Sequence, residues 1–349
     1  MRTLIRAALR QSTGDIRHIT PVAPAAAHGP VARVYHEAER DFGLLAPPLV
    51  LHSPAPAALA ASWLLLRETL LAPGHVDRAL KETVATAVSR ANTCPYCVEI
   101  HQAKLDTLPT ADDGGRAGVL AWFDGEPGSV ADRDIPELAG VATTFHYLNR
   151  MVALFLPASP LPRQAPQAVR DPMLRMVARS MRPTTPGPLR PAASLDLLPP
   201  APLPADLAWA AGHPAVAGAL ARSAAALDAA VAPWLTEPVR NTVDRHIERY
   251  DGTAPGPGRA WLTEALAAPA PDRLPPGQGP VAALALLTAL APYRITDDDV
   301  RAFRTVRPTD RDLVALTSWA ALRAARHLGT RLATPAHQAA SSNGPTTRS

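Results

Sequence analysis

The sequence predicts an all-α protein. Hydrophobic residues make up 47% of its 349 residues, which is enough for a large core, whereas aromatic residues make up only 5%. Alanine and leucine are abundant, and this composition favours closely packed helices over a β-sandwich, which would need more valine, isoleucine, threonine and tyrosine. Apolar residues recur at helical spacing over long segments, and no strand pattern is apparent.

The first part of the chain contains strong helical signals. Residues 56–71 are predicted to be helical because Pro54 and Pro56 mark the start and Pro73-Gly74 marks the end. The next helix is expected over residues 76–90, where apolar residues share one face. Two more helices are expected, one from Thr93, a candidate N-cap, to about Asp106, and one over the apolar residues 135–155.

The middle of the chain is rich in proline. Prolines recur every few residues from 156 to 204, which predicts an extended connector on the surface, where only residues 172–181 could hold a short helix. A second helical block follows, and the small, polar tail is expected to be disordered. The predicted regions are a catalytic domain over residues 1–156, the connector over 157–205, a second helical domain over 206–333 and the tail over 334–349.

The second block resembles a degenerate copy of the first. The matching pairs of segments are 53–55 with 213–215, 76–84 with 235–243, and 137–151 with 312–326. In this alignment Glu82 falls on Asn241 and Cys94 falls on Thr253, and no second CxxC motif follows. We therefore predict a tandem duplication in which one half is catalytic and the other is scaffold.

Charge and hydropathy exclude several classes of function. The net charge is +4, but the basic residues are nearly all scattered arginines, with lysine only at Lys81 and Lys104. Because no basic stripe with interleaved aromatic residues occurs, we expect no nucleic-acid partner. Arginines interrupt the apolar stretch in residues 1–10, which does not fit a signal peptide, and no apolar run approaches the length of a membrane span. A soluble, cytoplasmic protein is expected, in a compartment that keeps thiols reduced unless they cycle.

Both cysteines lie in one motif, Cys94-Pro95-Tyr96-Cys97. A disulfide at this spacing closes only a short loop and removes little unfolded-state entropy, so the pair suits redox cycling better than structural cross-linking. On a helix Cys94, Cys97 and His101 share one face, and His101 lies one turn after Cys97, close enough to exchange a proton with it. The helix dipole favours a thiolate in the first turn, which by itself indicates Cys94 as the more acidic thiol. A thiolate can attack a peroxide or a disulfide, and the neighbouring thiol then resolves the product.

Glu82 precedes this motif on the neighbouring predicted helix. Small, uncharged side chains flank it, so we expect Glu82 to pack against another helix, where a carboxylate could relay protons to His101. An alternative is an ordinary i, i+4 ion pair with Arg78. The chain lacks the further cysteines of a structural zinc site, whereas a catalytic zinc bound by both cysteines and His101 is a second alternative.

The pattern Glu82-x(11)-Cys94-x(2)-Cys97-x(3)-His101 resembles the AhpD-like alkylhydroperoxidases of the carboxymuconolactone decarboxylase superfamily, over roughly residues 46–156. The resemblance implies an all-helical fold and peroxide reduction by paired thiols, without a cofactor or metal. It implies that Cys97 is the peroxidatic residue and Cys94 the more exposed resolving residue, with Glu82 and His101 as the proton relay. One position departs from the family, because Tyr96 stands where the best-known members carry a histidine. A tyrosine, with an ordinary pKa of about 10, is a poorer proton shuttle.

The leading prediction is thus a peroxide or disulfide reductase with an unidentified dithiol reductant. One alternative is a decarboxylase or lactone-processing enzyme of the same superfamily, whose members need no CxxC motif. The other is a non-enzymatic redox sensor whose disulfide alters partner binding. Residues 145–150 are too polar for a plain core helix and either line the site or serve as a cap or interface. A homo-oligomer, either a dimer or a trimer, is expected, since small helical domains of this kind bury faces against copies of themselves.

Overall fold

The computed structural model describes residues 12–109, 113–161, 166–267 and 273–334. Within these ranges the chain is helical and contains no β-strand, so the predicted all-α fold is confirmed. None of the described helices is both long enough and apolar enough to cross a membrane. The segments 1–10 and 335–349, on which the predictions about a signal peptide and a disordered tail depend, lie outside the described residues.

The first block contains a series of helices that surround α8. Their bounds are α2 Gly29–Glu37, α3 Pro47–Val50, α4 Pro56–Leu65, α5 Arg78–Ala91, α6 Pro95–Leu105, α7 Asp113–Phe123 and α8 Ile135–Phe155. The α2 and α4 helices continue as short π-helices, η3 Ala38–Phe42 and η4 Leu66–Leu71. Together α4 and η4 occupy the predicted range 56–71, and α8 matches its predicted range. The α2 and α7 helices have no counterpart among the predictions.

The start of α6 differs from the prediction. The helix begins at Pro95, whose fixed φ suits the first helical position, and Cys94 is the N-cap residue. Thr93 has a φ of +51°, a left-handed conformation that is uncommon for a β-branched residue. The prediction that Thr93 caps the helix is therefore wrong. Since α6 begins at Pro95, Cys97 also lies in the first turn, where the helix dipole favours a thiolate.

The proline-rich connector is not extended throughout. It contains α9, Gln167–Ser180, which begins earlier than the predicted short helix and holds Pro172 in its interior. The α9 helix packs against α6. Leu174 and Ala178 on α9 form a small apolar cluster with Ala103 of α6 and with Leu161. These contacts offset the hydrogen bond that an interior proline removes. The prediction of an extended chain is therefore wrong over residues 167–171, whereas the range in which a short helix was allowed, 172–181, is helical as far as Ser180.

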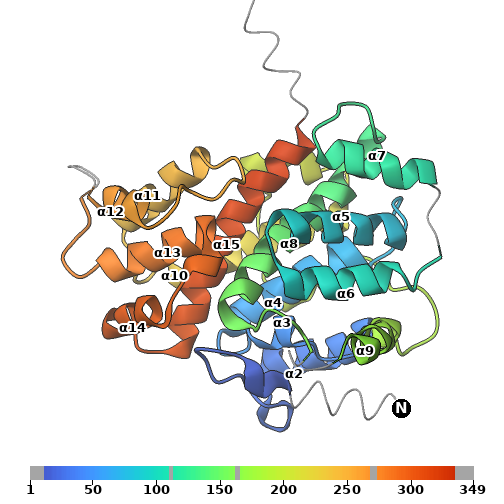
Figure 1. Ribbon diagram of the computed structural model, residues 1–349, viewed down its shortest axis with the longest axis horizontal. Helices are drawn as coiled ribbons and strands as arrows, with labels where there is room; N and C mark the ends of the chain where they lie inside the picture. The colour runs from blue at the N-terminus through green and yellow to red at the C-terminus, as the bar shows by residue number, and fades with distance from the viewer. Residues whose placement is uncertain (1–11, 110–112, 162–165, 268–272, 335–349) are drawn as a thin grey trace, which may run out of the picture.

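The second block packs directly against the first. Its helices are α10 Pro214–Val231, α11 Glu237–Glu248, α12 Ala260–Leu266, α13 Gly279–Leu290, α14 Asp297–Val306 and α15 Asp310–Ala333. Figure 1 shows α15 crossing the molecule beside α8, with α11 to α14 on one side and α5 to α7 on the other. The α10 helix packs against α4, and buried residues of both blocks form one hydrophobic core.

The most extensive helix packing across the two blocks joins the helices matched in the predicted repeat, α4 with α10 and α8 with α15. This face-to-face arrangement fits a duplication, which stays a prediction, as do the domain boundaries. At the crossing of α8 and α15, a Cβ on Gly329 would lie 1.9 Å from the Thr143 hydroxyl oxygen. A glycine at position 329 therefore permits the close approach of the two helices.

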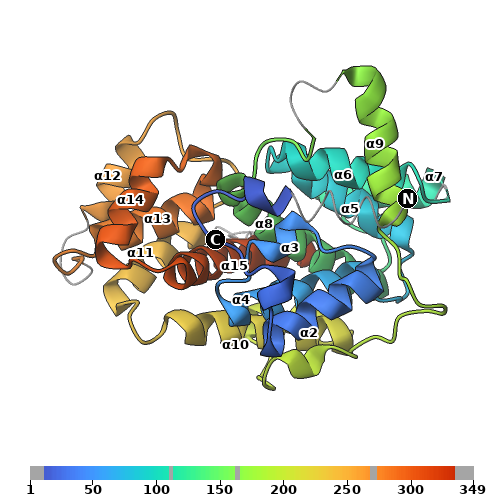
Figure 2. The same ribbon diagram turned by 90° about the horizontal axis from the view of Figure 1, so that it is seen from below.

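The α5 helix packs against both α6 and α8 and brings the helices of the predicted site together. Figure 2 shows α9 standing beside α6 at the side of the molecule away from the second block. The predicted catalytic helices thus lie between a connector helix and the central helix α8.

Candidate active site

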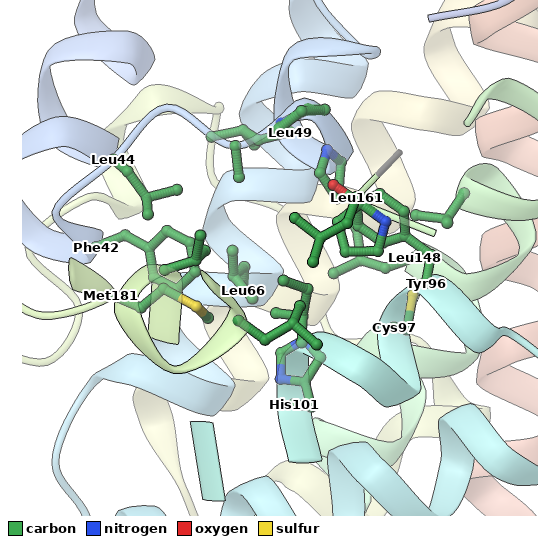
Figure 3. Close-up of a pocket in the computed structure, with 18 of the residues that line it drawn as sticks. Phe42, Leu44, Leu49, Leu66, Tyr96, Cys97, His101, Leu148, Leu161 and Met181 are labelled. Carbon is green, nitrogen blue, oxygen red and sulfur yellow. The ribbon is translucent and has the colours of Figure 1, made fainter. Parts of the chain in front are cut away.

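An apolar cavity of about 430 Å³ lies between α6, α8, α9 and the chain around residues 42–49. Its apolar wall includes Phe42, Leu44, Leu49, Leu66, Leu148, Leu161 and Met181. Cys97 and His101, both on α6, are among its few polar lining residues. Figure 3 shows Cys97 across the cavity from Phe42 and Met181. The cavity therefore presents a thiol and an imidazole to an otherwise apolar space.

The two thiols are close together and unbonded. Both cysteines are free, and the Cys94 thiol donates a hydrogen bond to the Cys97 sulfur across 2.9 Å. Cys94 is 3% exposed and Cys97 is 5% exposed. The prediction that Cys94 is the more exposed thiol is therefore wrong. Cys97 lines the cavity and Cys94 is not among the lining residues, so a molecule in the cavity meets the Cys97 sulfur first.

Glu82 is fully buried and holds His101. Its Oε2 accepts a hydrogen bond from His101 Nδ1 at 2.7 Å, and its Oε1 accepts two from Arg78, from Nη2 at 2.6 Å and from Nε at 2.9 Å. The relay contact predicted with His101 and the alternative ion pair with Arg78 therefore both exist. An ionised carboxylate can only accept hydrogen bonds, so Nδ1 carries the proton and Nε2 is the basic nitrogen of the neutral ring.

Electrostatics keep Glu82 ionised. Burial alone would raise the pKa of this carboxyl group, but the charges and hydrogen bonds of Arg78 and His101 outweigh burial and lower it to about 2. The carboxylate is thus available at neutral pH to stabilise the imidazolium that forms when His101 takes up a proton.

His101 is not hydrogen-bonded to either thiol in the described part of the chain. The ring packs edge-on against Phe145 with ring centroids 4.5 Å apart. Because His101 and Cys97 line the same cavity, a proton can pass between them through a molecule that occupies it.

The environment of Cys97 favours the neutral thiol. Burial raises the pKa of the Cys97 thiol well above its usual value, and the adjacent Cys94 raises it further, whereas a hydrogen bond from the Asn149 side chain acts in the opposite direction. Burial also raises the pKa of Tyr96, which lines the cavity, and this phenol stays protonated. Tyr96 therefore cannot act as a base near neutral pH.

Asn149 belongs to a polar network that the sequence only partly indicated. Asn92 donates a hydrogen bond from Nδ2 to Asn149 Oδ1 at 2.9 Å, and Asn92 also lies against His146, with its Nδ2 3.1 Å from the ring Nδ1. Burial lowers the pKa of His146 well below its usual value, so this ring is neutral. The sequence signal for this network was the polar segment 145–150 inside an apolar helix. This segment lines the cavity at Phe145 and Leu148 and joins the polar network at Asn149.

No described group of three or more histidine, cysteine, aspartate or glutamate side chains is arranged to hold a metal ion. The ring nitrogen Nδ1 of His101 is instead bound to Glu82. In the second block, Asn241 and Thr253, at the positions matched to Glu82 and Cys94, are exposed.

Comparison with known proteins identifies the family of the chain. The carboxymuconolactone decarboxylase family model matches residues 57–105, which include Glu82, Cys94, Cys97 and His101. The protein named alkyl hydroperoxide reductase Rv2159c, from Mycobacterium tuberculosis (strain ATCC 25618 / H37Rv), is 38% identical over 357 aligned residues, which cover 95% of this chain and 99% of that protein. Because this likeness extends through both helical blocks, the chain belongs to the AhpD-like group of the carboxymuconolactone decarboxylase superfamily.

Proposed function

We propose that this protein is a thiol peroxidase that reduces organic hydroperoxides to alcohols. The observation that carries the proposal is the meeting of Cys97 and His101 in one apolar cavity, with the Cys94 sulfur 2.9 Å from that of Cys97. The name of the relative, an alkyl hydroperoxide reductase, supports the same reaction class. An apolar wall suits the carbon skeleton of an organic hydroperoxide better than it suits hydrogen peroxide.

In the proposed first step a hydroperoxide, ROOH, lies between His101 and Cys97. The thiol proton passes through the bound molecule to His101 Nε2, and the ionised Glu82 stabilises the resulting imidazolium. The Cys97 thiolate attacks the terminal peroxide oxygen, forming an S–O bond as the O–O bond breaks. The leaving alkoxide takes the proton from His101, so the thiol and ROOH become a Cys97 sulfenic acid and the alcohol ROH.

In the second step the Cys94 thiol attacks the sulfenic acid sulfur. A disulfide forms and water leaves, which requires the sulfurs to move from 2.9 Å to bonding distance. Thiol–disulfide exchange with an external dithiol then restores both thiols. The balanced overall reaction converts ROOH and a dithiol into ROH, water and the oxidised form of the dithiol. Disulfide reduction by the same thiol pair is the reverse of this last exchange.

The proposal also covers the cellular compartment and the oligomeric state of the protein. We propose that the protein acts in the cytoplasm, where reduced dithiols are present to recycle the Cys94–Cys97 disulfide. We further propose that it works as a homo-oligomer, either a dimer or a trimer. Light scattering of the purified protein and a screen of dithiol proteins as electron donors test these two points.

Mass spectrometry of single-cysteine variants tests the chemistry. The native protein should lose two hydrogens after one equivalent of cumene hydroperoxide. Cys97→Ser should not react at its remaining thiol, whereas Cys94→Ser should stop at a sulfenic acid that dimedone traps. Neither variant should turn over with a dithiol. Retention of both thiols after peroxide treatment of the native protein would contradict the proposal, and lactone conversion by the double serine variant would favour the decarboxylase alternative.

A further inference from the structure

The cavity that holds the reacting thiol carries very little charge. The lining side chains that can ionise are those of Asp15, Tyr96, Cys97 and His101, and no described arginine or lysine lines the cavity. The phenol of Tyr96 and the thiol of Cys97 are neutral in their buried surroundings. An exposed carboxyl group is ionised at neutral pH, so Asp15 brings a negative charge to this otherwise apolar space.

Asp15 lies where the cavity opens to solvent. It is the last residue of the short 3-10 helix η1, Ser12–Asp15, and it is exposed although it lines the cavity. Arg17 ties the segment after η1 to the end of α8, because its guanidinium donates to the carbonyl oxygens of Leu154 at 3.1 Å and Leu156 at 2.9 Å. No hydrogen bond or ion pair within the described ranges engages the Asp15 carboxylate, so its charge is not neutralised by a partner.

His101 does not supply a cation that an anionic ligand could pair with. Its Nδ1 hydrogen is donated to Glu82 at 2.7 Å, which leaves Nε2 of the neutral ring as an acceptor. When the ring takes up a proton, the Glu82 carboxylate already balances the new charge. The other polar side chains that line the cavity, those of Ser62, Tyr96 and Cys97, are uncharged.

A negative group on a ligand that the cavity encloses therefore has two positions, and both are unfavourable. Against the apolar wall the group loses its hydration and gains no cation in return. At the opening it meets the carboxylate of Asp15, and the two like charges repel each other. An uncharged ligand of the same shape avoids both costs.

We propose that the cavity selects neutral organic hydroperoxides over anionic ones of the same size, and that Asp15 is a specificity-determining residue at its opening. The apolar wall favours a carbon skeleton, whereas Asp15 and the lack of a lining cation disfavour a carboxylate on that skeleton. This inference rests on the proposed function, because it names the substrate class of the dithiol site.

The binding test uses two cumyl alcohols, one with a carboxylate and one with a carboxamide in the para position. The two compounds have nearly the same shape, differ by one charge and lack the reactive O–O bond. Calorimetric titration of the native protein at neutral pH and low salt should show that the carboxamide binds at least about tenfold more tightly. Asp15→Asn should strengthen binding of the carboxylate by about fivefold, as expected for unit charges roughly 4 Å apart in water, and leave the carboxamide within about twofold.

Asp106→Asn is the matched control for this substitution. Asp106 is an exposed carboxylate at the end of α6, accepts a hydrogen bond from Gln102 at 2.8 Å and does not line the cavity. The control changes the net charge by the same amount and should leave both affinities unchanged. Added salt should reduce the gain from Asp15→Asn, because salt screens exposed charges.

The outcomes separate this inference from the proposed function. Equal affinity of the native protein for the two alcohols would overturn the inference, and this comparison requires no variant to fold. An equal gain from Asp106→Asn and Asp15→Asn would also overturn the role of Asp15. The matching para-substituted cumene hydroperoxides should show the same order in kcat/KM.

Binding of the alcohols requires no turnover. A preference for the carboxamide in a protein that no hydroperoxide oxidises would reject the proposed function and retain the selectivity of the cavity. Equal kcat/KM values for the two hydroperoxides would reject the selectivity and retain the proposed function.

Discussion

Replacing Glu82 with glutamine removes the charge of the proposed relay with little change of shape. The native carboxylate accepts from His101 Nδ1 at 2.7 Å and from Arg78 at 2.6 and 2.9 Å. A glutamine has one acceptor and one donor end, and Arg78 can only donate, so the glutamine oxygen should face Arg78 and its nitrogen should face His101. His101 Nδ1 must then accept, which places the ring proton on Nε2. The glutamine variant therefore loses the base that faces the cavity.

The expected loss of rate follows from the bond that disappears. A hydrogen bond to a charged group contributes roughly 1.5–3 kcal/mol. At about 1.4 kcal/mol for each factor of ten, the rate of Cys97 oxidation at neutral pH should fall roughly 10- to 100-fold. The free energy of unfolding should also fall. Breaking a buried ion pair costs about 3–5 kcal/mol, and because the Arg78 side chain is 26% exposed and can regain water, we expect a loss of about 1–3 kcal/mol.

The effect on stability should depend on pH in one direction. The pKa of Glu82 is about 2 in the folded protein, against a reference value of 4.5. A carboxyl group with a lowered pKa stabilises the fold above its unfolded-state pKa and loses that contribution as the pH falls toward its folded-state pKa. The stability difference between native protein and Glu82→Gln should therefore be constant around neutral pH and shrink in acid.

Stopped-flow oxidation by cumene hydroperoxide and urea unfolding measure the two effects. Glu37→Gln is the matched control, because Glu37 is also a buried carboxylate, bonded to Trp63 at 2.9 Å and Ser194 at 2.6 Å, and does not line the cavity. This control should lose stability but keep the native oxidation rate. A folded Glu82→Gln protein whose rate stays within about twofold of native would refute the reasoning about the ring proton.

Two other predictions concern the cavity and the start of α6. Leu174→Trp on α9 places a larger side chain in the cavity wall and should raise KM for cumene hydroperoxide much more than for hydrogen peroxide. Equal losses for both substrates in steady-state assays would show that cavity volume does not select the substrate. Thr93→Asn puts a residue that tolerates a left-handed conformation at a φ of +51° and should stabilise the protein by about 0.5–1 kcal/mol in urea unfolding. A lower stability would mean that the threonine side chain makes a compensating contact.

The sequence predicted the fold class and the helices that carry the dithiol motif, because their signals are local. Periodicity and proline boundaries placed α4, α5, α6 and α8 to within a few residues. The small side chains around Glu82 correctly indicated a buried carboxylate, which is 0% exposed. The candidate relay contact then followed from spacing on adjacent helices, and the structure brings Glu82 and His101 to 2.7 Å.

What the sequence did not predict depends on contacts between distant segments. Proline content indicated a connector with at most a short helix over residues 172–181, whereas tertiary packing of Leu174 and Ala178 supports the longer helix α9. Thr93 has the chemistry of an N-cap, but the turn between α5 and α6 requires a left-handed residue there. The hydrogen bond between Asn92 and Asn149 joins residues 57 positions apart, so no local pattern could specify it. The relative exposure of the two thiols likewise depends on how α6, α8 and α9 enclose them.

The close crossing of α8 and α15 has a consequence for the evolution of the chain. The helix that carries Phe145 and Asn149 is supported along one side by the cysteine-free half. A shortened protein that ended after α8 would expose the apolar side chains on that side of the helix to water, and these side chains would promote aggregation. The second block can accept many changes on its outer faces, but along α15 it must keep a shape complementary to α8. If the predicted duplication took place, the second half could lose its catalytic residues and still be required for the stability of the first.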